Sequence, residues 1–165
     1  METMTDSESN EVDKRLHVIA GRWETSGYVI GEPRIPVVGT DIYELLAGGH
    51  FVVHHVDATV GGRPVRAIEV IGEPDSGSGG YLARSFDSEG NVEVMHVTID
   101  DNGVFRFAGG ADIAPAARLT GSARGEVRST LRIAGDRRSM TALWERSEDG
   151  TTWQPWMDMT FTRRD

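Results

Sequence analysis

Residues 81–110 read YLARSFDSEGNVEVMHVTIDDNGVFRFAGG, and this stretch decides the fold class. Runs rich in valine, isoleucine and phenylalanine alternate in it with two turn sequences, Ser88–Asn91 and Asn102-Gly103. Asn-Gly is a strong hairpin signal because both residues tolerate a positive φ. The stretch therefore predicts successive antiparallel strands joined by tight turns.

The same pattern continues on both sides of this stretch. Gly61-Gly62 separates FVVHHVDATV from PVRAIEVIG, and Asp149-Gly150 separates MTALWERS from WQPWMDMTFT. The predicted strands span residues 21–30, 39–46, 50–60, 65–73, 80–87, 92–100, 103–109, 116–123, 127–134, 138–147 and 153–163.

A meander of this length has to close on itself to remove its exposed strand edges. We therefore expect an all-β fold, a single closed antiparallel meander barrel of about 8 to 11 strands. We also expect one short helix within residues 12–20, leading into the first strand, and a loop over one mouth of the barrel at residues 109–117.

The bulk composition limits the class of protein. With 165 residues, of which 38% are hydrophobic, the chain is expected to form one domain at 13–165 after a disordered acidic tail at 1–12. A formal net charge of −9 argues against nucleic-acid and anionic-membrane partners. Cysteine is absent, which excludes disulfides and thiolate chemistry. Because the N-terminus also lacks an apolar signal segment, we expect a cytoplasmic protein.

Alternation along each strand predicts which side chains point inward. Within 92–100, the set Met95, Val97 and Ile99 is expected to be buried. Within 50–60, either the face that carries His54 or the face that carries His55 is internal, and the first has less charge. In the last strand, the methionines and Phe161 share a face with Arg163.

The histidines are the first candidates for chemistry. His54 and His55 point to opposite faces, and His50 lies about 13 Å from His54 at ~3.3 Å per residue, so neither pair can share a metal ion. A metal would need one of them together with His96 and a carboxylate. We expect no metal and no cofactor. An internal histidine could instead exchange a proton with a bound ligand, and the alternative is a hydrogen bond within the barrel wall.

Two carboxylates, Glu69 and Glu145, lie within apolar strands, where a charge is costly unless it is paired. Facing outward they would be solvated, whereas facing inward either would pair with an arginine or a histidine and anchor a ligand. The candidate ligand-binding residues are Tyr43, His54, His55, Glu69, Arg84, Met95, His96, Phe105, Phe107, Trp144 and Met157. The candidate acids or bases are His54, His55, Glu145 and Tyr43.

The stretch Leu16–Trp23 reads LHVIAGRW, and its Gly21-Arg22-Trp23 at the head of the first strand is similar to the signature of lipocalins and other calycins. The resemblance implies that Trp23 closes the narrow end of the barrel and that Arg163, from the last strand, stacks across it. Such a contact contributes about 0.5–2 kcal/mol.

Three longer stretches extend the resemblance: GGHFVVHHVD at 48–57, YLARSFDSEGNVEV at 81–94 and WERSEDGTTWQPWMDMTFTRR at 144–164. They resemble a bacterial family of lipocalin-like domains of unknown function, which implies an internal cavity and transfers no catalytic residue. The nitrobindin-type haem barrels share a similar opening but ligate haem through a histidine near the C-terminus. No histidine follows His96 in this chain, so haem ligation of that kind is not expected.

Three functions follow from these observations. The first is a binding protein that holds an apolar or amphipathic small molecule inside the barrel. The alternative is a small barrel enzyme, such as a cyclase or isomerase of specialised metabolism, with one internal acid or base. A third is a structural module that associates through a strand edge, with a homodimer as one possible form and a collapsed interior.

Overall fold

The computed structural model describes residues 12–109 and 125–165, and these form an all-β barrel preceded by one short helix. Among these residues, no helix is long and apolar enough to cross a membrane. The elements are α1 (Lys14–His17), β1 (Gly21–Val29), β2 (Ile35–Leu45), β3 (Val52–Val60), β4 (Arg63–Asp75), β5 (Gly80–Asp87), β6 (Val92–Ile99), β7 (Phe105–Gly109), β8 (Glu126–Ile133), β9 (Ser139–Ser147) and β10 (Gln154–Arg164).

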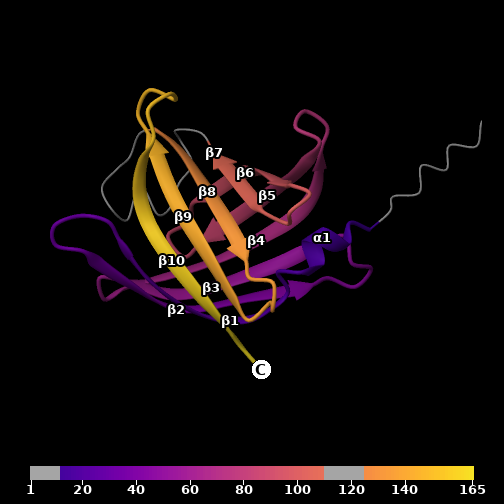
Figure 1. Ribbon diagram of the computed structural model, residues 1–165, viewed down its shortest axis with the longest axis horizontal. Helices are drawn as coiled ribbons and strands as arrows, with labels where there is room; N and C mark the ends of the chain where they lie inside the picture. Colours follow the sequence, from indigo (N-terminus) through magenta and orange to yellow (C-terminus); the bar gives the residue numbers. More distant parts are fainter. Residues whose placement is uncertain (1–11, 110–124) are drawn as a thin grey trace, which may run out of the picture.

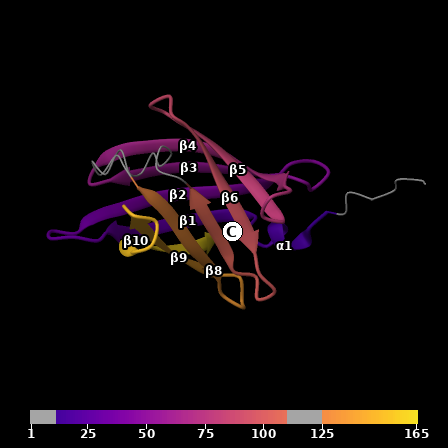
Figure 2. The same ribbon diagram turned by 90° about the horizontal axis from the view of Figure 1, so that it is seen from above.

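The ten described strands follow one another around a closed barrel, and every neighbouring pair is antiparallel (Figure 1, Figure 2). The ring closes where β1 pairs with β10, with Trp23 opposite Arg163. The predicted closed meander and the N-terminal helix are therefore confirmed. The predicted strand at 116–123, most of the loop at 109–117 and nearly all of the tail at 1–12 lie outside the described residues.

The turn chemistry explains the register of the hairpins. Between β3 and β4, Gly61 and Gly62 have φ values of 57° and 81°, which residues with a side chain rarely adopt. A two-residue turn with two positive φ values matches the right-handed twist of the strands that it joins. It sets Val60 opposite Arg63, and the whole β3–β4 register follows from that pair.

Side-chain alternation fills the barrel interior with apolar groups. Met95, Val97 and Ile99 are buried, as expected for β6, and Phe161 is buried on β10. On β3, the buried side chains Val52, His54 and Ala58 belong to the inward face. The structure thereby answers the question that the sequence left open for this strand: the face that carries His54 is internal. Burial of its valine and alanine side chains removes apolar area from water.

One end of the barrel is packed shut by residues from three parts of the chain. The Arg163 guanidinium lies 4.3 Å from the centre of the Trp23 ring and donates hydrogen bonds to the carbonyls of Ala20 (2.8 Å) and Arg137 (2.6 Å). The Trp23 indole N–H donates to the carbonyl of Ile19 at 3.0 Å. Leu16 of α1 is buried beside them, so the helix, the first strand and the last strand are joined at this end.

Candidate functional site

The barrel interior contains a cavity of about 230 Å³. The ionisable lining residues all lie on β2–β6, whereas β7–β10 contribute apolar side chains apart from Ser129. The lining residues are Thr25, Val37, Asp41, Tyr43, His54, Val56, Ala58, Val60, Val65, Ala67, Glu69, Ser85, Glu93, Met95, Phe107, Ser129, Leu131, Ala142, Trp144, Met157, Met159 and Phe161.

The polar wall is a continuous row across five neighbouring strands. Tyr43 pairs with His54, His54 with Glu69, Glu69 with Ser85, and Ser85 with Glu93, each directly across from the next. We call these five residues the polar arc. Directly opposed side chains of one sheet face have Cβ atoms about 4.5–5.5 Å apart, so the arc presents its groups side by side.

His54 is the centre of a buried hydrogen-bond network. Its Nε2 lies 2.6 Å from Oδ1 of Asp41, and its Nδ1 lies 3.1 Å from Oε1 of Glu69. The hydroxyl of Thr25 donates to the second oxygen of Asp41. A carboxylate only accepts hydrogen bonds, so two ionised partners require both ring nitrogens of His54 to donate, which makes the ring an imidazolium.

The two carboxylates decide the protonation of this histidine. Burial by itself lowers the pKa of His54, but the hydrogen bonds and charges of Asp41 and Glu69 outweigh burial and raise the pKa to about 9. His54 is therefore protonated at neutral pH and has both of its N–H groups in use.

Tyr43 stacks on this network. Its ring lies 3.9 Å from the His54 ring, centre to centre, with the two planes 10° from parallel. Tyr43 is 5% exposed, and its hydroxyl makes no hydrogen bond with any residue that the structure describes. Burial, followed by the charges of Asp41 and Glu69, raises the pKa of this phenol well above its ordinary value. A neutral phenol hydroxyl that lines a cavity and has no partner among the described residues is available to a ligand.

The opposite wall is apolar except for Ser129 of β8. Side chains of β7–β10 face the polar arc across the cavity, and we call them the apolar wall: Phe107, Leu131, Ala142, Trp144, Met157, Met159 and Phe161. Trp144 is half-buried and meets the buried Trp156 edge to face, with the ring centres 6.4 Å apart. Methionine and aromatic side chains adapt to ligands of different shape.

Several sequence candidates do line the cavity, namely Tyr43, His54, Glu69, Met95, Phe107, Trp144 and Met157. Glu69 faces inward and pairs with His54. Of the two positions that the sequence analysis allowed for this carboxylate, the inward, paired one is therefore observed. Phe105 is 1% exposed and packs in the core, yet it does not line the cavity.

Two histidine candidates lie on the outer face of the barrel: His96, whose assignment to the cavity was wrong, and His55, for which the sequence left the face open. His55 lies 3.5 Å from Glu44, and its side chain is 44% exposed. His96 lies 2.7 Å from Asp75, and its side chain is 59% exposed. Each follows an inward-facing residue, so strand alternation sends it outward.

Arg84 also lies on the outer face, which corrects its assignment to the cavity, and Glu145 takes the outward alternative of the sequence analysis. Arg84 pairs with Glu73 at 2.6 Å across β4 and β5, with both side chains nearly half exposed. Glu145 pairs with Arg128 at 2.9 Å, and the guanidinium of Arg128 also covers the Trp153 ring. Glu145 directly follows the inward-facing Trp144 and therefore cannot reach the cavity.

Sequence reasoning missed five polar residues of the lining: Thr25, Asp41, Ser85, Glu93 and Ser129. A signal was present for two of them. Asp41 lies two residues before Tyr43 and Glu93 two residues before Met95, and strand alternation places such pairs on one face. The contact of Asp41 with His54 is not visible in the sequence, because it depends on the β2–β3 register.

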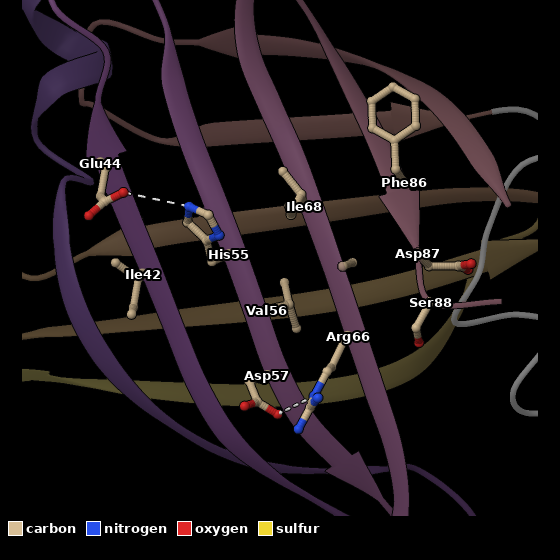
Figure 3. A pocket seen from close by; sticks show the side chains of 11 residues that line it. Ile42, Glu44, His55, Val56, Asp57, Arg66, Ile68, Phe86, Asp87 and Ser88 are labelled. Atoms are coloured by element: carbon tan, nitrogen blue, oxygen red, sulfur yellow. Dashed lines mark hydrogen bonds and ion pairs between the residues drawn. The ribbon is translucent and has the colours of Figure 1, made fainter. Parts of the chain in front are cut away.

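The structure contains a second hollow, on the outside of the barrel, with a volume of about 980 Å³. Figure 3 shows Ile42, His55, Ile68 and Phe86 along its floor, one on each of β2–β5. Ile68 and Phe86 are 45% and 50% exposed, so this hollow is open to water and not enclosed. We therefore take the interior cavity as the candidate site. Within residues 12–109 and 125–165, no three histidine, aspartate or glutamate side chains are placed to hold a metal ion.

Comparison with known proteins supports the fold alone. No protein-family model matches the chain, and no curated protein matches it. The crystal structure of Rv2717c from M. tuberculosis is similar with a TM-score of 0.60 and 12% identity, over 94% of this chain and 100% of that one. A de novo designed fluorescence-activating β-barrel is 14% identical with a TM-score of 0.48, over 93% and 100% of the two chains. The resemblance to a bacterial lipocalin-like family stays a prediction.

Proposed function

We propose that this protein binds a small amphipathic molecule inside its barrel. The observation that carries the proposal is the 230 Å³ interior cavity with the polar arc on one wall and the apolar wall on the other. A ligand with one polar end and one apolar end would match both walls at once.

The cavity volume sets the size of that molecule. An apolar cavity of about 150 Å³ holds benzene, so by simple scaling 230 Å³ suits a ligand of about nine non-hydrogen atoms. The volume also exceeds the few-water void expected of a barrel that serves only as a structural module. The Tyr43 hydroxyl argues in the same direction, since it lines the cavity without a hydrogen-bond partner among the described residues, and buried polar groups are usually paired.

The network around His54 favours binding over acid–base catalysis. A general base needs an accepting lone pair, and both ring nitrogens of His54 donate to carboxylates. The pKa of about 9 keeps this ring protonated at neutral pH. A cyclase or isomerase built on this cavity would therefore have to use a group other than His54 as its base.

The experiment that tests the proposal is native mass spectrometry of the protein purified from cells without denaturation. We expect a fraction of the protein to carry a small organic molecule that is released on unfolding. Trp144 lines the cavity, so the released molecule added back to stripped protein should change the tryptophan emission. A protein that carries nothing, and whose emission and Tm respond to no member of a panel of small amphiphiles, would contradict the proposal.

A further inference from the structure

The charge of the cavity restricts the ligand further. Asp41, Glu69 and Glu93 supply carboxylates to the lining, and His54 supplies one imidazole. No lysine or arginine is among the described residues that line the cavity. The ionisable groups of the lining are therefore mostly acidic.

The net charge of the Asp41–His54–Glu69 group follows from its hydrogen bonds. Both bonds need a proton between the ring and a carboxylate, so the three groups share two such protons. With both protons on the ring, one imidazolium and two carboxylates carry a net charge of −1. Moving either proton along its hydrogen bond to a carboxylate leaves that net charge unchanged. Loss of either proton makes the group more negative. This count does not include Glu93, which has interactions of its own.

Acceptors remain on the polar arc beside this negative charge. Glu69 uses Oε1 for His54, and its second oxygen has no partner among the described residues. The neighbouring position across β4 and β5 is Ser85, whose hydroxyl also lines the cavity. The Tyr43 hydroxyl, in a side chain that is 95% buried, can accept a hydrogen bond as well as donate one.

We propose that the polar end of the ligand is a protonated amine, held by the second carboxylate oxygen of Glu69 in the part of the cavity that Tyr43 and Ser85 also line. This inference rests on the proposed function, because it assumes that the cavity takes a ligand. An ammonium group donates hydrogen bonds to carboxylate and hydroxyl oxygens and offsets the negative charge of the Asp41–His54–Glu69 group. A carboxylate in the same place would meet a like charge, which is unfavourable.

The test is a comparison of ligands that differ only in the polar group. Two series suit the cavity volume: hexylamine, 1-hexanol and hexanoate, and 2-phenylethylamine, 2-phenylethanol and phenylacetate. Binding is measured at pH 7 by titration calorimetry and by tryptophan emission. In at least one series we expect the amine to bind about tenfold or more tighter than the carboxylate, with the alcohol between them.

Two substitutions, each of which removes one negative charge, test whether the preference for the amine arises at Glu69. Glu69→Gln keeps an acceptor for His54 but removes the negative charge, and it should reduce the preference for the amine by about tenfold. Glu44→Gln removes a charge from the outer face of β2, where the side chain is 66% exposed, and should leave the preference unchanged. Thermal unfolding of each variant checks that the barrel is intact.

Each other outcome overturns the inference, and the outcomes separate it from the proposed function. If the alcohol or the carboxylate binds as well as the amine, the cavity takes ligands but does not select a cation. If Glu44→Gln reduces the preference as much as Glu69→Gln does, the selectivity comes from the overall charge of the protein. If no member of either series binds and the purified protein carries no ligand, the proposed function fails together with the inference.

Discussion

The His54 imidazole lies flat against the Tyr43 phenol ring, with the ring centres 3.9 Å apart and the planes 10° from parallel. The two residues are direct partners across β2 and β3. The carboxylates of Asp41 and Glu69 hold the imidazole at both nitrogens, so the ring cannot rotate without breaking a hydrogen bond. The stack therefore fixes the Tyr43 ring as well, and it gives the polar arc a defined shape before a ligand enters.

Loss of the His54 side chain should destabilise the barrel strongly. His54→Ala leaves Asp41 and Glu69 buried close together without the cation that bridges them, and breaking a buried pair costs about 3–5 kcal/mol. The measurement is the free energy of unfolding in urea at pH 7. His55→Ala, on the exposed face of the same strand, is the matched control and should change the free energy by less than about 0.5 kcal/mol. Equal effects of the two substitutions would contradict the network.

The stability of the protein should depend on pH through His54. The pKa is raised from 6.5 to about 9 on folding, so the folded state holds the proton more tightly than the unfolded state does. The stabilisation is fully present below pH 6.5 and is lost as pH rises to about 9. At about 1.4 kcal/mol per pKa unit, the loss is of order 3 kcal/mol.

The comparison of wild type with His54→Gln isolates this contribution. Both proteins are unfolded in urea at pH 6 and at pH 9.5, and the change in free energy between the two pH values is compared. We expect the wild type to lose more stability than the variant over this interval. The same dependence in both proteins would show that other groups cause it.

A larger side chain at position 142 should block the cavity without unfolding the barrel. Ala142 is 3% exposed on the apolar wall, and Ala142→Met extends into the empty volume. We expect ligand binding to weaken at least tenfold while the free energy of unfolding falls by no more than about 1–3 kcal/mol. Thr141→Met, on the outer face of the same strand, should leave binding unchanged. Unaltered binding in Ala142→Met would place the ligand elsewhere.

Arg163 should stabilise the barrel because its guanidinium contacts the Trp23 ring and donates two hydrogen bonds to backbone carbonyls at the same time. Arg163→Ala removes the contact with Trp23 and two charged hydrogen bonds to backbone carbonyls, for an expected loss of about 2–3 kcal/mol in unfolding free energy. Arg163→Lys should recover little of it, because an ammonium group lacks the planar fork. Arg164→Ala, which breaks an exposed pair with Glu24, should cost less than about 1 kcal/mol. Equal losses at 163 and 164 would contradict the role of the Trp23 contact.

The fold could be predicted because its signals are local. Turn sequences such as Asn102-Gly103 and Gly61-Gly62 mark the hairpins, and alternation within each strand marks the buried side. The position of the β2 start was less well predicted: the strand begins at Ile35 and not near residue 39. Glu32 and Pro33 precede it, and turn residues of this kind leave the exact start of a strand poorly defined.

The candidate site could be predicted only in part. Alternation alone separates Met95 from His96 and Trp144 from Glu145, and strict use of it would have removed the outward candidates. For Glu69 the strand pattern was balanced, because its neighbours on both faces are apolar. Its partner His54 lies on another strand, so only the pairing of β3 with β4 could decide the question.

The amino-acid sequence by itself determined that the chain forms short antiparallel strands with tight turns and that these close into a barrel. Those properties depend on residues within a few positions of one another, or on the need to pair every strand edge. Only the tertiary structure decided that Asp41, His54 and Glu69 meet inside the barrel, with His54 and not His55 on the inner face of β3. The physical reason is register: a shift of one residue between neighbouring strands exchanges the inner and outer faces, and that shift is settled by the packing of the whole core.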